Sequence, residues 1–547
     1  MKFLLSGKAQ MGENDMANST SKVFIFSLTR NRVIVALIGL CFGLPSGLLL
    51  QWPSETRTLS AFHIGELFPS NIYMGNGAVA GSPITVHGAL DFIPAWIAGV
   101  IFPGEAHTYA TITIMAVCVI VAQMLFILLL AGLLPRNRSL LPLMFVIGLI
   151  ASQTVHYRDL GLILSIYMFY LSFECPPGRR QLTLLVATGF STYIAFLWSW
   201  NRGVPGLIAV SIAMFILAMR GRRQYWLGLV AIVATSLVLA ILFPVFSLGT
   251  ILDNLRILSR VSESTSYDWT MDGGMRTRIG FFGIYLAAAI SMAIYLIKRP
   301  RGSWKYAQAS LWGVLLIACI KIGIDRFDWQ HQMPSVWVCL AVLVVSGPSV
   351  ASVMHQTSFI FASAIFLVAL WLCIGSSHPL VVLLAALALS SLSVSWPITE
   401  MTAVWTLLCL FTLVTHLGFA NSFRLGDPVE LVQRFSTGPE LSTSQRWLLA
   451  QVADQPCLVD LTYRGMISEL TQVPSCFRFG SLSWVPESSQ LELIKNVQTQ
   501  SPNIIVWPKN YGTSLAEPSN LFIRWVEVNY PRVKCMEDEC IRTRAES

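Results

Sequence analysis

The apolar residues of this chain fall into long runs that are separated by short polar connections. Most runs approach the roughly 20 residues that a helix needs to cross the hydrocarbon core of a membrane. The pattern predicts a polytopic α-helical membrane protein with about thirteen transmembrane helices. The runs lie near residues 33–52, 109–134, 140–156, 158–173, 182–200, 204–219, 224–245, 279–297, 307–324, 334–350, 357–375, 379–396 and 398–418.

One further apolar run, residues 84–102, is ambiguous. If this run crossed the membrane, the basic loops that follow it would lie outside. If it does not cross, those loops lie in the cytoplasm, as the positive-inside rule favours. The loops in question carry Arg136, Arg138, Arg179, Arg180, Arg220, Arg222, Arg223, Lys298, Arg299, Arg301 and Lys305. We therefore predict that residues 84–102 form a helix in the outer membrane interface.

This topology divides the chain into three parts. Residues 1–32 form a cytoplasmic N-terminal segment, and residues 33–418 form the transmembrane core with a large first periplasmic loop at residues 53–108. After the last apolar run, charged residues follow one another closely. Because an odd number of spans places the C-terminus outside, residues 419–547 are expected to form a small periplasmic α/β domain. We expect short strands near 458–461 and 503–507 and helices near 487–499 and 518–530.

Four cysteines lie in the expected C-terminal domain, at positions 457, 476, 535 and 540. An even number of cysteines suits one or two disulfides in an oxidising periplasm. Cys457 with Cys476 and Cys535 with Cys540 is the simplest pairing, although the two other pairings and four free thiols remain alternatives. A zinc site is disfavoured, since no histidine lies in this domain.

Composition supports a membrane protein, because 54% of the residues are hydrophobic and only 12% are charged. A soluble domain carries about twice that charged fraction. The net charge of +8 is spread over short loops between apolar runs. This distribution reports membrane topology and excludes a nucleic-acid partner.

Ionisable residues within or beside membrane spans are costly to place and are therefore functional candidates. Several of them gather on the predicted outer side. Arginine and lysine there can neutralise a phosphate, and a carboxylate can take the proton from an attacking hydroxyl. Each residue alone also fits a solvated helix cap or an arginine that reaches the lipid headgroups. The candidates are Glu55, Arg57, His87, Asp91, Arg158, Asp159, Arg202, Lys321, Arg326, Asp328 and His331.

Motifs for common cofactors are missing from the sequence. It has no Walker A loop, no GxGxxG after a strand, no HExxH and no CxxC pair. Nothing therefore indicates ATP, a dinucleotide or a transition metal. A divalent cation held by carboxylates stays open.

Three short stretches resemble patterns of the GT-C superfamily of membrane glycosyltransferases. Residues 53–57 (Pro-Ser-Glu-Thr-Arg) look like the acidic stretch that follows the first span, with Ser54 in place of the first acid. Residues 87–91 and 326–331 are similar to less well-defined patterns of the same superfamily. The similarity is to the aminoarabinose-transferase, protein-mannosyltransferase and bacterial arabinosyltransferase-like members.

The resemblance implies transfer of a sugar from a polyprenyl-phosphate donor to a glycan, lipid or protein acceptor at the periplasmic face of the bacterial inner membrane. Glu55 or Asp91 would be the general base. The resemblance does not choose between a hexosyl and a pentosyl donor. The residues that would hold the lipid phosphate are Arg57, His87, Arg158, Asp159, Arg202, Lys321, Arg326, Asp328 and His331.

Two other functions fit parts of the pattern. A transporter or flippase of a lipid-linked glycan would bind phosphate with the same basic residues, but it should show an inverted repeat or paired broken helices. An O-antigen polymerase or ligase also places Arg and His on a large outer loop. That loop usually comes late in the order of spans, whereas here the first loop is the largest.

Overall fold

The structure is a computed structural model, and it describes somewhat more than half of the chain. The described residues are 85, 87–102, 107–133, 151, 154–264, 274–297, 302–325, 329–346, 365–366, 368–369, 441–462, 466–477, 489–508 and 521–545.

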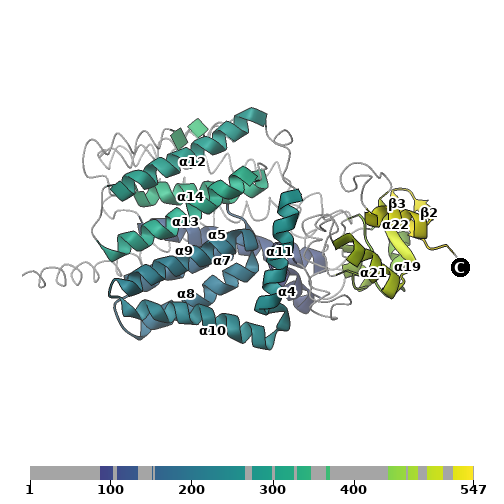
Figure 1. Ribbon diagram of the computed structural model, residues 1–547, viewed down its shortest axis with the longest axis horizontal. Coiled ribbons are helices and arrows are strands. Elements are labelled where there is room, and N and C mark those ends of the chain that lie inside the picture. The colour runs from purple at the N-terminus through teal and green to yellow at the C-terminus, as the bar shows by residue number, and fades with distance from the viewer. Residues whose placement is uncertain are drawn as a thin grey trace, which may run out of the picture.

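Long helices packed side by side form the larger part of the described structure (Figure 1). They are α5 (His107–Leu133), α7 (Leu160–Glu174), α8 (Arg179–Trp198), α9 (Trp200–Met219), α10 (Trp226–Leu242), α12 (Gly274–Ile297), α13 (Ser303–Asp325) and α14 (Trp329–Ser346). Within the described residues, six helices are long and apolar enough to cross a membrane. The chain is therefore a multi-pass membrane protein, while the expected spans at 33–52, 379–396 and 398–418 lie outside the described residues.

The two ends of this helical bundle differ in charge. At one end, which we call the basic end, lie Arg179, Arg180, Arg220, Arg222, Arg223 and Lys305. The Arg222 guanidinium lies 4.3 Å from the centre of the Phe173 ring, and that of Arg220 lies 4.7 Å from the Tyr306 ring. These cation–π contacts join the end of α9 to α7 and α13. The clustering agrees with a topology in which all these loops share one compartment.

Short helices lie at the opposite end, which we call the site end. They are α4 (Ile93–Ile101), the 3-10 turn η2 (Tyr157–Asp159) and α11 (Leu248–Ser264). Helix α4 has nine residues, so it extends only about 14 Å and is too short to span a membrane. This agrees with the prediction that the run 84–102 does not cross. Helix α11 stands across the ends of the bundle helices in Figure 1.

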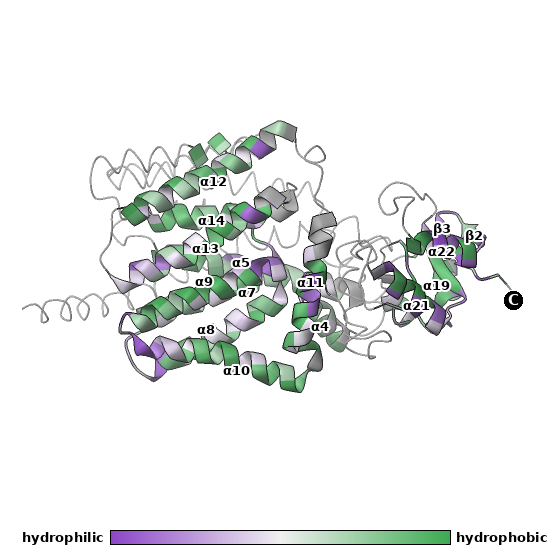
Figure 2. Cartoon of the chain, viewed as in Figure 1, coloured by the Kyte–Doolittle hydropathy of each residue, from purple (hydrophilic) through white to green (hydrophobic). Residues whose placement is uncertain are grey.

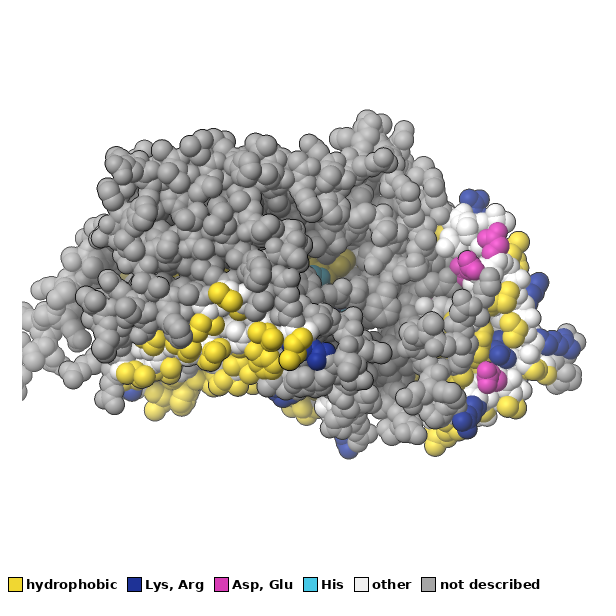
Figure 3. Space-filling model, turned by 90° about the horizontal axis from the view of Figure 1, so that it is seen from above, with side chains coloured by type: hydrophobic (Ala, Val, Ile, Leu, Met, Phe, Trp, Pro, Cys, Tyr) yellow, Lys and Arg dark blue, Asp and Glu magenta, His cyan; other side chains and the backbone are white. Residues whose placement is uncertain are grey.

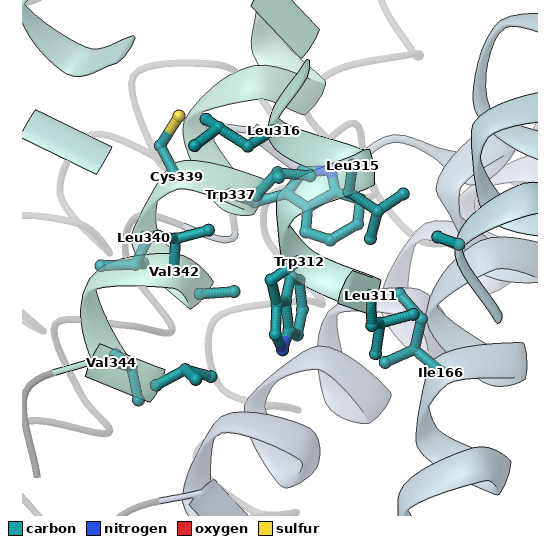
Figure 4. Close-up of a cluster of buried hydrophobic side chains, with 14 of the residues drawn as sticks. Ile166, Leu311, Trp312, Leu315, Leu316, Trp337, Cys339, Leu340, Val342 and Val344 are labelled. Carbon is teal, nitrogen blue, oxygen red and sulfur yellow. The ribbon is translucent and has the colours of Figure 1, made fainter. Parts of the chain in front are cut away.

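The largest hydrophobic cluster of the bundle includes residues of α7, α13 and α14. Trp312 and Trp337 are completely buried there, and Figure 4 shows them among leucine and valine side chains of α13 and α14. Trp312 donates a hydrogen bond of 2.8 Å from its ring nitrogen to the hydroxyl of Tyr170. The buried Trp312 indole therefore keeps a polar partner, which lowers the cost of placing its N–H away from water.

Helices α8 and α10 cross at unusually close range. A Cβ atom placed on Gly189 would lie 2.3 Å from the carbonyl oxygen of Gly228, so the backbones touch at this point. Small residues at a helix crossing are typical of membrane proteins, where packing rather than the hydrophobic effect holds helices together.

The C-terminal unit comprises residues 441–545, and its described residues contain four helices and a small sheet. The helices are α19 (Thr443–Val452), α20 (Met466–Thr471), α21 (Gln490–Gln500) and α22 (Leu521–Asn529). Strands β1 (Ile504–Pro508), β3 (Glu539–Thr543) and β2 (Arg532–Met536) form an antiparallel sheet in the order β1-β3-β2. The expected strand near 458–461 makes only single bridges, from Leu458 to Ser475 and from Asp460 to Val506.

Two disulfides close this unit, and they are the simplest pairing that the sequence suggested. Cys457 bonds Cys476, and Cys535 bonds Cys540. The first bond is fully buried and ties the segment before the Leu458 bridge to the segment before Phe477. The second joins directly opposed residues of β2 and β3.

The surface changes character along the molecule. In Figure 3, apolar side chains gather over the bundle, whereas lysine, arginine and acidic side chains gather over the C-terminal unit. Figure 2 shows the same contrast along the ribbon, with polar residues in the bundle concentrated near its two ends. An apolar belt between two polar ends is the surface expected of a protein that sits in a bilayer.

Candidate functional site

Residues 85 and 87–91 lead to Asp91, and we call them the Asp91 segment. Backbone hydrogen bonds join this segment to the junction between α8 and α9. The amide of Leu90 donates to the carbonyl oxygen of Leu197 at 2.9 Å, and the amide of Trp200 donates to the carbonyl oxygen of His87 at 2.6 Å. A Cβ on Gly88 would lie 2.2 Å from the carbonyl oxygen of Trp198. Glycine is therefore required at position 88 for this close backbone approach.

Asp91 is buried and receives hydrogen bonds from two side chains of η2. The Tyr157 hydroxyl donates to Oδ1 at 3.0 Å. Arg158 donates from Nη2 to Oδ2 at 2.8 Å and from Nε to both oxygens at 3.2 Å. Asp91, Tyr157 and Arg158 are 5%, 1% and 9% exposed. A guanidinium that meets a carboxylate side-on fixes the orientation of both groups.

A second buried ion pair lies on the same turn. The Nε of Arg202, in the first turn of α9, lies 2.5 Å from Oδ1 of Asp159. Asp159 is completely buried. The turn therefore contacts the Asp91 segment through Arg158 and helix α9 through Asp159.

The sequence His156–Asp159 explains why the chain turns here. The amide of His156 donates to Oδ2 of Asp159 at 2.7 Å, and the His156 ring accepts from the amide of Arg158 at 3.4 Å. These reciprocal bonds form a capping box at the start of η2, and helix α7 follows directly. Such a box satisfies amides that have no partner within a helix.

The structure brings together four of the predicted site residues and separates or leaves out the others. Asp91, Arg158, Asp159 and Arg202 form the cluster described above. His87 is half-buried four residues before Asp91, and Lys321 is exposed one turn before the end of α13. Outside the described structure lie Glu55, Arg57, Arg326 and Asp328, and so does the side chain of His331, whose backbone belongs to α14.

Sequence reasoning missed Tyr157, Trp200 and Asn254. Tyr157 directly precedes the predicted site residues Arg158 and Asp159, so its place in a polar turn could have identified it. The Trp200 ring nitrogen donates to the carbonyl oxygen of Thr85 at 3.0 Å, and the Asn254 side-chain oxygen accepts from the amide of Thr85 at 3.2 Å. These contacts cross 115 and 169 positions of sequence, so no local pattern predicts them.

A metal site is not apparent in the described part of the chain. Among these residues, no group of three or more histidine, cysteine, aspartate or glutamate side chains is arranged to hold a metal ion.

No protein-family model and no curated protein matches the sequence. Among solved structures, the chain is similar to ArnT from Cupriavidus metallidurans bound to undecaprenyl phosphate, with a TM-score of 0.46 and 12% identity over 95% of this chain and 98% of that chain. It is also similar to the oligosaccharyltransferase AglB from Archaeoglobus fulgidus in complex with an inhibitory peptide and a dolichol-phosphate. That TM-score is 0.41, with 12% identity over 88% of this chain and 69% of that chain.

Proposed function

We propose that the protein is a glycosyltransferase that moves a sugar from a polyprenyl-phosphate carrier to a cell-envelope acceptor at the outer face of the bacterial inner membrane. The observation that supports this proposal is the pair of buried ion pairs, Asp91–Arg158 and Asp159–Arg202, on one turn at the site end of an apolar bundle. Burying charges at a membrane boundary is costly, so such pairs favour a functional role over a stabilising one.

The proposed reaction is a direct displacement at the sugar. An acceptor hydroxyl oxygen bonds to the anomeric carbon while the bond from that carbon to the phosphate oxygen breaks. The bonding electrons leave with the lipid phosphate, and a carboxylate takes the hydroxyl proton. The configuration at the anomeric carbon is inverted. Cations beside the phosphate stabilise the charge that grows on it.

Glu55 is the proposed general base, with Asp91 as the alternative. Both oxygens of Asp91 already accept hydrogen bonds from Tyr157 and Arg158. This arrangement suits a carboxylate that orients the Arg158 guanidinium better than one that must meet an acceptor hydroxyl. The proposed phosphate ligands are Arg57, His87, Arg158, Arg202, Lys321, Arg326 and His331, with Asp159 and Asp328 orienting the cations.

The donor class, the membrane and the orientation are part of the same proposal. The N-terminus would lie in the cytoplasm and the C-terminal unit in the periplasm, where its two disulfides are stable. The acceptor would be a glycan, a lipid or a protein. A divalent cation would assist only if carboxylates of the first loop supply its ligands.

The test is donor consumption by the purified protein in lipid vesicles. Hexosyl and pentosyl polyprenyl phosphates are supplied in turn with a cell-envelope extract, and released polyprenyl phosphate is measured by chromatography. Glu55→Gln should lower the rate by about 10²- to 10⁴-fold, the usual effect of losing a general base. Asp91→Asn should also lower it, because Arg158 loses its charged partner.

Asp253→Asn is the matched control, since Asp253 is an exposed acid on α11 at the same end of the bundle. It should keep the wild-type rate. Wild-type release of polyprenyl phosphate in both Glu55→Gln and Asp91→Asn would contradict the assignment of the site. A wild-type protein that moves the donor across the bilayer without releasing its phosphate would instead be a flippase.

A further inference from the structure

We infer that Asn254 of α11 is a positioning residue through which the C-terminal unit holds the Asp91 segment in place. The inference rests on the proposed function for the importance of Asp91. The connection between the C-terminal unit and the Asp91 segment does not depend on the proposed function, because the contacts of α11 define it.

The first contact joins α11 to the chain just before Asp91. The side-chain oxygen of Asn254 accepts a hydrogen bond from the amide of Thr85 at 3.2 Å, and both residues are more than nine-tenths buried. On its other side, the carbonyl oxygen of Thr85 accepts from the Trp200 ring nitrogen at 3.0 Å. Thr85 is therefore held between α11 and α9, six positions before Asp91.

The second contact joins α11 to the C-terminal unit. Ile257 is 6% exposed and belongs to a hydrophobic cluster whose other members all come from that unit. The buried disulfide cysteines Cys457 and Cys476 are part of this cluster. Ile257 follows Asn254 by three positions, so the two side chains lie on neighbouring parts of one helix face.

The third observation is that α11 lies between the two parts it contacts. Figure 1 shows α11 standing between the bundle and the C-terminal unit. A second cluster joins Ile251 of α11 to Ala89 and Leu90 of the Asp91 segment and to Leu448 and Val506 of the C-terminal unit. On the other side of α11, Leu248 and Leu252 are exposed. The buried face of α11 thus contacts both the Asp91 segment and the C-terminal unit.

Together these contacts connect the C-terminal unit to the Asp91 segment through α11. If α11 loses its support from the C-terminal unit, Asn254 moves away from the Thr85 amide. The segment that carries Asp91 then loses one of its backbone anchors and keeps its contacts with α8, α9 and η2. The geometry therefore assigns the C-terminal unit a part in fixing the site, beyond any contact with an acceptor.

Amide hydrogen exchange of the full-length protein in detergent micelles tests this connection without depending on activity. Asn254→Leu keeps the approximate side-chain volume but removes the acceptor, so exchange in the peptide that covers residues 85–92 should accelerate about fivefold. Asn254→Asp retains an acceptor oxygen and should restore most of the protection. Ile257→Ala should accelerate exchange in the same peptide, because it weakens the packing of α11 against the C-terminal unit.

Leu252→Ala is the control, because Leu252 lies on the exposed face of α11 and is 55% exposed. It should leave exchange at 85–92 unchanged. The inference is overturned if Asn254→Leu has no effect on that peptide, if Asn254→Asp accelerates exchange equally, or if Ile257→Ala leaves the peptide protected. Donor consumption is measured in parallel. Accelerated exchange in a protein whose wild type consumes no polyprenyl-phosphate donor would refute the proposed function and leave the positioning role intact.

Discussion

Single glycines decide how closely the chain can pack around the candidate site. Gly88, Gly161 and Gly203 come from three different parts of the chain, and each lies against the last turn of α8. A Cβ on Gly161 would lie 2.8 Å from the Cα of Ala195, and one on Gly203 would lie 2.3 Å from the carbonyl oxygen of the same residue. The end of α8 is therefore the common support for the Asp91 segment, for α7 and for α9.

Gly88→Ala should displace the Asp91 segment, because the new methyl group would lie 2.2 Å from the carbonyl oxygen of Trp198. We expect a loss of about 1–3 kcal/mol in the free energy of unfolding, as overpacking usually causes. Thermal unfolding in detergent micelles measures this loss. Gly249→Ala is the control, since nothing lies within 4 Å of its Cβ position. Equal stability of the two variants would contradict the close approach at position 88.

At the scale of helices and strands, hydrophobicity predicted the bundle well. Apolar runs placed α5, α7, α8, α9, α10, α12, α13 and α14 to within a few residues, because lipid demands a continuous apolar surface. The β2–β3 hairpin was missed. Its turn contains Glu537 with a positive φ of 54° and no glycine, so it lacks the usual turn signal. The expected strand near 458 fails because it pairs through isolated bridges only.

Part of the candidate site was predictable because charged residues next to long apolar runs are conspicuous in the sequence. The acids and arginines near membrane exits stand out against apolar runs, so Asp91, Arg158, Asp159 and Arg202 were identified from the sequence. Their pairing was not, because Asp91 and Arg158 are 67 positions apart and nothing local specifies the contact. Asn254 lies in an amphipathic stretch where one polar residue on the buried face is inconspicuous.

Gly189→Leu should separate α8 from α10. The added side chain would collide with the backbone of Gly228, which lies 2.3 Å from the Cβ position. Since α10 contacts the bundle mainly through α8 and α9, we expect a loss of about 1–3 kcal/mol in stability, measured as thermal unfolding in micelles. Gly313→Ala in the middle of α13 is the matched control, because its Cβ meets nothing within 4 Å. It should be neutral or stabilising by about 0.5–1 kcal/mol.

Over the whole molecule, the basic end and the C-terminal unit lie at opposite ends of the apolar bundle. Cys175 is a free, partly exposed thiol at the basic end, directly after α7. The four cysteines of the C-terminal unit are bonded in pairs. The proposed orientation, with the basic end in a reducing compartment and the C-terminal unit in an oxidising one, predicts this difference.

Thiol labelling of intact spheroplasts tests this arrangement. A membrane-impermeant maleimide should not label Cys175, whereas a permeant maleimide should, and Cys175→Ser identifies the signal. Val528→Cys, at a position that is 77% exposed in the C-terminal unit, supplies the opposite control. It should react with the impermeant reagent. Labelling of Cys175 from outside would reverse the proposed orientation.

The two ion pairs of the η2 turn have an electrostatic consequence for any anionic ligand. Two acids, Asp91 and Asp159, face two arginines, Arg158 and Arg202, so the formal charges of the described cluster cancel. A phosphate that approaches this turn gains little long-range attraction from it, because opposite charges so close together act as small dipoles. In the proposed function the attraction comes from cations elsewhere, and the candidates from the sequence are Arg57, His87, Lys321, Arg326 and His331. If the proposed function holds, the turn contributes orientation of the ligand rather than long-range attraction.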